Sequence, residues 1–188
     1  MRDFYERFYA AMNRSRAHAA FCERVFGLNL CQHGFADMAQ IDALIRATRL
    51  GPGMRALDLG CGNGMIAEYL SDCTGAHVTG LDYIPAAIDQ ARQRTVAKAG
   101  RLAFTVGDIN ALALPTAAFD VILSIDTLYF ADDLALTVGQ LQRALRPGGR
   151  MAASTRTAAN PGRRSRNSPR RPFRRTKRRS PWRCGPMG

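Results

Sequence analysis

The 188-residue sequence lacks several features that would place a protein in a class at once. No apolar run approaches the roughly 20 residues that a membrane-spanning helix needs. The first residues, MRDFYE, carry mixed charge where a secretory signal has an apolar segment. The five cysteines form no CxxC pair, and the three histidines stand at no ligand spacing from them. We therefore expect free thiols, no metal site and a cytoplasmic location away from membranes.

Acidic residues are absent from the end of the chain. Residues 156–188 contain 12 Lys and Arg but no Asp or Glu, whereas residues 1–155 hold 15 basic and 15 acidic residues. The net charge of +12 therefore belongs entirely to the tail. Because the tail is also poor in aliphatic residues and has no periodicity, we expect it to be disordered.

Two patterns precede the tail. Residues 1–50 predict a helical cap whose apolar side chains pack in the core, with a lid over a ligand as a compatible role. Its three stripes are Phe4, Phe8, Ala11 and Met12; Phe21, Val25 and Phe26; and Ile41, Leu44 and Ile45.

From residue 54, short apolar runs alternate with helical stretches, which predicts a parallel sheet. The expected strands are Arg55–Leu59, His77–Leu81, Leu102–Val106, Phe119–Ile125 and Arg150–Ala153.

Helices are expected over Gly64–Ser71, Pro85–Lys98 and Asp132–Leu145. In the last of these, the predicted buried stripe is Leu134, Val138, Leu141 and Leu145, and residues 146–149 form a turn into the fifth strand. The fold class is therefore α/β, with a doubly wound Rossmann-like parallel sheet. The expected division is a helical cap (1–50), a Rossmann-like domain (51–155) and an Arg-rich tail (156–188).

The stretch ALDLGCGNG, residues 56–64, places three glycines between a predicted strand and a predicted helix. Ligands of doubly wound sheets bind at the carboxyl ends of the strands, where this loop would lie. Because glycine has no Cβ, a ligand can lie directly on the backbone there. The spacing G-x-G-x-G departs from the dinucleotide fingerprint G-x-G-x-x-G, because Met65 stands where the third glycine is required. Together with Asp58 ahead of the loop, this favours a cationic ligand such as a sulfonium over a phosphate.

Acids also follow the next two predicted strands. Asp82 lies 20 residues after Gly62, where a carboxylate accepts hydrogen bonds from ribose hydroxyls. Asp108 can accept from an exocyclic amine while Ile109 packs against a purine. These positions predict a nucleoside pocket without phosphates. Two alternatives stay open, with Asp82 capping the next helix and Asp108 serving as a turn acid.

Five motifs stand in order at suitable spacing: ALDLGCGNG, VTGLDY, FTVGDI, FDVILSIDTLYF and LRPGG. Together they resemble the class I S-adenosylmethionine-dependent methyltransferases of the small-molecule type, over about residues 35–155. The resemblance implies S-adenosylmethionine as cofactor and methyl transfer to a small-molecule acceptor. The methionine end of the cofactor would be held by Asp58, Gly60, Cys61, Gly62, Ser124 and Ile125. The ribose and adenine would be held by Asp82, Tyr83, Asp108 and Ile109.

Catalytic residues stay unassigned from the sequence. A sulfonium methyl is already activated, so placing the acceptor in line supplies most of the acceleration, and a base is needed only for a protonated acceptor. Asp126, Tyr129 and His33 are the candidates for substrate contacts. A turn cap for Asp126, a wall position for Tyr129 and a solvent-exposed or structurally bonded His33 are the alternatives.

The resemblance ends near residue 155. The family's sheet has two further strands, an antiparallel pair, and no strand pattern for them follows the fifth strand, which predicts an uncovered edge. One interpretation is a frame shift near residue 155 that truncates the enzyme. The other is a genuine basic extension that binds nucleic acid through its charge, with Phe173 and Trp182 stacking on bases. A nucleic-acid-binding protein, an RNA methyltransferase and a cofactor-binding fragment without turnover are therefore the alternatives to a small-molecule methyltransferase.

Overall fold

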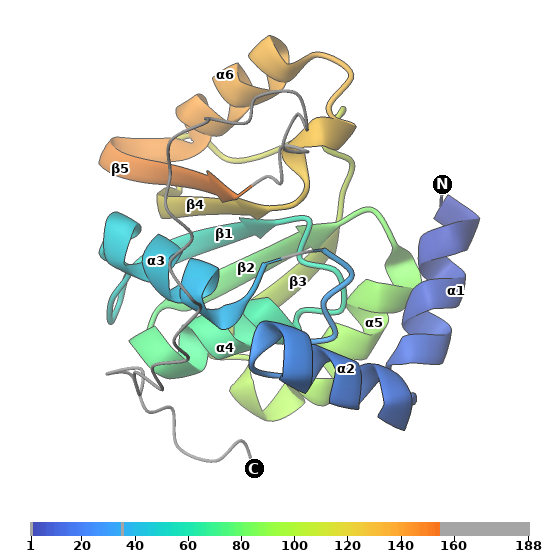
Figure 1. The fold of residues 1–188 in the computed structure, drawn as a ribbon. Coiled ribbons are helices and arrows are strands. Elements are labelled where there is room, and N and C mark those ends of the chain that lie inside the picture. The colour runs from blue at the N-terminus through green and yellow to red at the C-terminus, as the bar shows by residue number, and fades with distance from the viewer. Residues whose placement is uncertain (1, 35, 155–188) are drawn as a thin grey trace, which may run out of the picture.

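The computed structural model describes residues 2–34 and 36–154 (Figure 1). Three helices come first: α1 (Arg2–Met12), α2 (Arg16–Phe26) and α3 (Met38–Thr48). The expected tail, 156–188, lies outside the described residues, so its predicted disorder and nucleic-acid contacts stay predictions. None of the helices in the described ranges combines the length and apolar character needed to cross a bilayer.

Five parallel strands form one sheet in the order β3-β2-β1-β4-β5. They are β1 (Arg55–Leu59), β2 (His77–Asp82), β3 (Leu102–Val106), β4 (Phe119–Ile125) and β5 (Leu145–Ser154). The helices between them are α4 (Met65–Thr74), α5 (Pro85–Arg94) and α6 (Leu134–Ala144), with short 3-10 turns η1 (Val96–Lys98) and η2 (Leu128–Phe130). The strand order reverses between β1 and β4, which confirms the predicted doubly wound sheet and places a ligand-binding crevice at their carboxyl ends.

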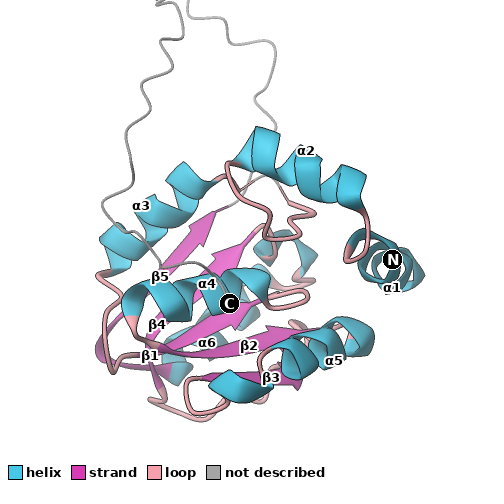
Figure 2. Cartoon of the chain, turned by 90° about the horizontal axis from the view of Figure 1, so that it is seen from below, coloured by secondary structure: helices cyan, strands magenta, loops and turns pink. Residues whose placement is uncertain are grey.

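Two apolar cores lie on opposite faces of this sheet. Successive strand residues point to opposite faces, so Val121 and Leu123 of β4 belong to one core while Ile122 belongs to the other. Helices α3, α4 and α5 cover the first face, and α6 covers the second (Figures 1 and 2). The continuous apolar runs of the strands follow from this burial on both faces.

The turn predicted at residues 146–149 lies inside β5 as the structure defines it. Leu145 pairs with Phe119 and Arg150 pairs with Val121, so the residues between them bulge out opposite a single residue, Asp120. Gly148 supplies the positive φ of +77° that the bulge needs. The helix predicted over Pro85–Lys98 likewise ends at Arg94 and continues only as the 3-10 turn η1.

The apolar stripe predicted for the helix before β5 is confirmed only at its end, where Leu141 is in the second core and Leu145 packs against it. Leu134 and Val138 are 53% and 38% exposed, whereas Leu141 is fully buried. The buried residues of α6 are Thr137, Leu141 and Ala144, which share helical spacing on a neighbouring face. The sequence could not choose between these faces, because leucine occurs on both.

The predicted burial of the apolar side chains in the cap, residues 1–50, is confirmed only in part. Phe26 is buried, but Phe4, Phe21 and Val25 are each more than half exposed. Helices α1 and α2 lie beside the sheet-covering layer rather than on the sheet (Figure 2). The apolar residues of α1 pack on α5 instead of a sheet face, because Tyr9 forms a small core with Ile84 and Ala87. The expectation of core packing fails for the three exposed side chains.

Candidate functional site

A cavity of about 370 Å³ opens at the carboxyl ends of the strands. Its wall comes from the loops that follow β1, β2, β3 and β4 and from the cap: Arg2, Tyr5, Tyr9, Leu30–Gly34 and Ala36; Leu59–Asn63 and Ile66; Leu81–Ile84; Gly107–Asn110; and Ile125–Thr127, Tyr129 and Phe130. Arg2 is the only Lys or Arg among these described lining residues. The cavity therefore lies at the predicted edge and carries little positive charge for a phosphate.

The glycine loop forms one wall by virtue of its backbone conformation. Gly60, Gly62 and Gly64 have φ values of +77°, +56° and +76°, which L side chains rarely adopt. A Cβ at Gly60 would overlap the Thr127 side chain, and one at Gly62 would come within 2.9 Å of Cζ of Tyr9. The loop is fixed against β2, because the N–H groups of Gly60 and Cys61 both donate to the Leu81 carbonyl. Glycine is therefore required at positions 60 and 62 because the wall side chains of Thr127 and Tyr9 pack directly against the loop.

Asp82 joins this loop to the following helix. Its Oδ2 accepts a hydrogen bond from the Gly62 N–H at 2.7 Å, and its Oδ1 accepts from the Ile84 N–H at 2.9 Å. The alternative role at the start of α5 is therefore realised, since Ile84 provides no side-chain cap of its own. Burial raises the pKa of Asp82 despite these backbone hydrogen bonds. Each carboxylate oxygen keeps a second lone pair, and the residue lines the cavity.

Asp58 and Ser124 do not line the cavity. Asp58 is 2% exposed and Ser124 is fully buried, on the adjacent strands β1 and β4. Among the described residues, Asp58 Oδ2 and Ser124 Oγ have no hydrogen-bond partner. Burial, and secondly the charge of Asp82, raises the pKa of Asp58 to about 7. Neither side chain therefore makes a direct contact in the cavity wall, and the two point to opposite faces of the sheet, because Asp58 pairs with Leu123 of the first core and Ser124 pairs with Leu59 of the second.

Asp108 and Ile109 lie where the sequence predicts, at the cavity wall after β3. The Asp108 Oδ1 accepts from the Asn110 N–H at 2.8 Å, so the turn role is also realised. Asn110 in turn links this loop to the one after β4, because its amide donates to the Phe130 carbonyl and accepts from the Asp132 N–H. These contacts hold the walls contributed by β3 and β4 together.

The three candidate substrate contacts also line the cavity. His33 packs against the rings of Tyr5 and Phe8, with centroid distances of 4.9 and 4.8 Å. Burial, and secondly His18, lowers the pKa of His33, so it is neutral near pH 7. Asp126 has a positive φ of +54°, and Tyr129 is 59% exposed beside Phe130.

Several cavity residues were not predicted from the sequence. Tyr5 and Tyr9 reach it from α1, and Thr127 reaches it from the loop after β4. Asn63 is only 2% exposed and also lines the cavity. Asn63 carried one available signal, its place between Gly62 and Gly64. The cap tyrosines carried none, because their helical spacing is equally typical of core packing.

The prediction that the cysteines are free thiols is confirmed for three of the four described ones. Cys22, Cys31 and Cys61 are free thiols, and the last two line the cavity. Cys73 is disulfide-bonded, so the expectation of a free thiol is wrong at that position. Within the described ranges, no group of three or more His, Cys, Asp or Glu side chains could hold a metal ion.

The fold and the cavity define the class first: a doubly wound α/β protein whose acidic, glycine-walled crevice suits a nucleoside without phosphates. Residues 50–170 match the family model described as "Methyltransferase domain". The chain therefore belongs to the methyltransferase-domain family, and the resemblance to class I S-adenosylmethionine-dependent methyltransferases is confirmed.

Individual relatives agree with this assignment. The chain is 32% identical over 149 residues to the 27-O-demethylrifamycin SV methyltransferase of Amycolatopsis mediterranei (strain S699), covering 72% of this chain and 54% of that protein. It is 37% identical over 109 residues to the malonyl-[acyl-carrier protein] O-methyltransferase of Serratia marcescens, covering 58% and 41%.

A solved structure matches in the same way. The S-adenosylmethionine-dependent methyltransferase of Thiobacillus denitrificans, in complex with S-adenosylhomocysteine, has 30% identity and a TM-score of 0.54, covering 62% of this chain and 47% of that one. The chain thus spans about half the length of the relatives it matches.

Proposed function

We propose that this protein binds S-adenosylmethionine in the cavity and transfers its methyl group to a small-molecule acceptor. The observation that carries the proposal is the crevice built from the Gly60–Asn63 loop and the carboxylate of Asp82, with Arg2 as the only Lys or Arg among its described lining residues. Family membership supports the reaction class. The names of the relatives, which include a rifamycin and an acyl-carrier-bound malonyl group, support a small-molecule acceptor.

The residues present fit this cofactor. The Gly60–Asn63 backbone and the Asp82 carboxylate line the cavity, and the buried Asp58 Oδ2, on the strand that leads into this loop, lacks a hydrogen-bond partner within the described ranges. We propose that Asp82 accepts from the ribose hydroxyls, with Tyr83 beside the adenine, and that Asp108 and Ile109 hold the adenine. Gly60, Cys61, Gly62 and Ile125 would surround the methionine end. When bound, the cofactor supplies an electrophilic methyl group on a sulfonium.

The remaining side chains would prepare the acceptor. Tyr5 and Tyr9 cover the cavity from the cap and would exclude water from the reacting atoms. Asp126 and Tyr129 would orient the acceptor. His33, which is neutral near pH 7, would accept the proton of an acceptor hydroxyl. Residues 1–50 would thus act as a cap on the cofactor-binding domain, residues 51–155.

Titration with S-adenosylmethionine and S-adenosylhomocysteine tests the cofactor. Both should raise the melting temperature, because a ligand at 100 times its Kd adds about 2.7 kcal/mol to the free energy of unfolding. A parallel titration with NAD should leave it unchanged. An equal shift with NAD, or none with either sulfur compound, would refute the proposal. Formation of S-adenosylhomocysteine with a panel of hydroxyl and carboxyl acceptors then separates an enzyme from a fragment without turnover.

The pH dependence of cofactor binding should follow Asp58. Cationic groups of the cofactor favour the charged form of Asp58. Because the pKa of Asp58 is about 7 without cofactor, binding near or below that pH releases a proton from its carboxyl group. We expect S-adenosylmethionine to bind roughly tenfold more weakly at pH 6 than at pH 8. Without cofactor, the raised pKa stabilises the folded chain at low pH, and this contribution is lost as the pH rises through about 7.

Calorimetric Kd values from pH 5.5 to 8.5 would measure this dependence. Asp58→Asn should flatten the profile, whatever its effect on the absolute affinity. Asp82 and His33 also line the cavity and titrate, so His33→Gln serves as the matched control and should keep the slope. A slope that survives in Asp58→Asn would assign the proton to another group.

The nucleic-acid alternative receives no support from the family match or from the relatives. Its basis, the basic tail, lies outside the described residues. The family match runs to residue 170, past the point where the resemblance ends. Retention on an RNA column decides this alternative. The full chain and a variant ending at Thr155 should elute at the same salt concentration if the tail plays no part. We propose the cytoplasm as the site of action.

A further inference from the structure

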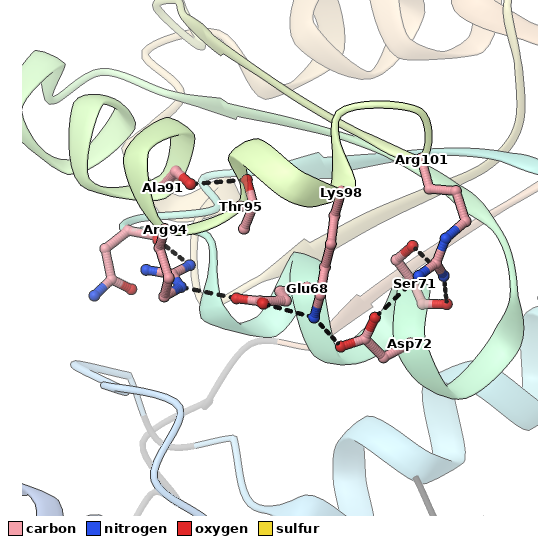
Figure 3. A network of polar contacts seen from close by, with 9 residues as sticks. Glu68, Ser71, Asp72, Ala91, Arg94, Thr95, Lys98 and Arg101 are labelled. Carbon is pink, nitrogen blue, oxygen red and sulfur yellow. Dashed lines mark hydrogen bonds and ion pairs between the residues drawn. The ribbon is translucent and has the colours of Figure 1, made fainter. Parts of the chain in front are cut away.

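A network of charged side chains joins α4 to α5 and to the segment that follows α5 (Figure 3). Glu68 accepts from Arg94 at 2.7 Å and from Lys98 at 2.8 Å. Asp72, one turn later, accepts from Lys98 at 2.6 Å and from Arg101 at 3.3 Å. The network therefore ties α4 to α5 and to the 3-10 turn that follows it.

One member of the network also reaches the glycine loop. The Arg94 Nη2 donates to the backbone carbonyl of Asn63 at 2.8 Å while its Nε donates to Glu68. Asn63 lies between Gly62 and Gly64 and belongs to the cavity wall. Arg94 does not itself line the cavity, so any effect on a ligand there must pass through the loop.

Glu68 is a firm anchor for this contact. It is only 8% exposed. Burial opposes its charged form, but hydrogen bonds from Arg94 and Lys98 outweigh burial and lower the pKa of the carboxyl. Glu68 therefore stays charged at neutral pH and holds the Arg94 guanidinium in place. The planar guanidinium can then serve two acceptors at once, which a lysine ammonium on a flexible stem does poorly.

The loop needs such support because glycines lose more conformational freedom on folding than other residues. Backbone hydrogen bonds to Leu81 and the carboxylate of Asp82 fix its first half. In the second half, next to the start of α4, the Gly64 N–H donates to the Cys61 carbonyl, and the Arg94 contact to the Asn63 carbonyl is the side-chain support. We propose that Arg94 is a positioning residue, which holds the Gly60–Gly64 backbone in the conformation that receives the cofactor. This inference rests on the proposed function for its ligand.

Lys98 offers a matched control. Its side chain is 28% exposed against 29% for Arg94, and both bind Glu68. The Lys98 ammonium donates to Glu68 and Asp72, which both belong to α4 and not to the loop. Arg94→Gln and Lys98→Gln should therefore lower the stability to urea by similar amounts. Only Arg94→Gln should weaken binding of S-adenosylhomocysteine, by about tenfold. Arg94→Lys keeps the positive charge but loses the planar guanidinium that serves two acceptors, so it should also weaken the binding of S-adenosylhomocysteine.

Amide hydrogen exchange of the ligand-free protein provides a readout that is independent of the cofactor. Residues 60–64 should exchange faster in Arg94→Gln than in Lys98→Gln. Equal exchange and equal Kd values in the two variants would overturn the proposal and leave the network a stabilising one only. If the wild-type chain bound no S-adenosylhomocysteine, the proposed function would fail, whereas faster loop exchange in Arg94→Gln would still support the positioning role.

Discussion

Replacing Asp82 by Ala should weaken the binding of S-adenosylmethionine and S-adenosylhomocysteine by about 100-fold. The substitution removes the proposed acceptor for the ribose hydroxyls. It also leaves the N–H groups of Gly62 and Ile84 without their acceptor. Hydrogen bonds to a charged group contribute about 1.5–3 kcal/mol each, and about 1.4 kcal/mol corresponds to a tenfold change in affinity. The loss of two hydrogen bonds between the ribose hydroxyls and the Asp82 carboxylate therefore accounts for the expected 100-fold change in Kd.

Calorimetric titration at pH 8 measures this effect, because Asp58 is then mostly charged. Asp89→Ala is the matched control. It removes a carboxylate from the same region of the chain, but one whose side chain is 61% exposed and whose partner, Arg92, is 3.7 Å away. Asp82→Asn keeps an acceptor oxygen and should give an intermediate Kd. A Kd for Asp82→Ala within threefold of the wild-type value would contradict the assignment of the ribose to this residue.

Gly62→Ala should destabilise the folded chain and also block the cofactor. The backbone φ of +56° disfavours any Cβ, at a cost of about 1–2 kcal/mol. The added methyl group would in addition collide with the hydroxyl of Tyr9. Overpacking of this kind costs about 1–3 kcal/mol more and shifts the loop that the cofactor contacts. We expect lower stability in urea and no measurable binding of S-adenosylhomocysteine at concentrations that saturate the wild type.

Gly53→Ala separates the two causes. Gly53 also has a positive φ, +74°, but no described atom lies within 4 Å of the position that an added methyl group would take. This control should lose about 1 kcal/mol of stability and keep its affinity for the cofactor. Combining Gly62→Ala with Tyr9→Phe removes the hydroxyl from the collision and should recover part of the lost stability. Equal behaviour of Gly62→Ala and Gly53→Ala would show that Tyr9 does not constrain the loop.

Local patterns in the sequence predicted the sheet and the edge at which the site lies. The runs that became β1 and β4 are largely apolar because the sheet is covered on both faces. The glycine spacing around Cys61 identified a loop that lines the cavity, and the acids Asp82 and Asp108 marked the ends of the next strands. All of these signals depend on residues a few positions apart, which is the range over which backbone conformation is encoded.

Contacts between distant residues were decided by the tertiary structure alone. The sequence could not place Asp58 and Ser124 behind the cavity rather than in its wall, because which side of a strand end faces a cavity depends on the packing of the neighbouring loops. Nor could it join Arg94 to Asn63, which are 31 residues apart. The sequence by itself determined the parallel sheet, the glycine loop and the family. The folded chain decided which side chains meet at the loop, since such contacts form only when separate elements pack together.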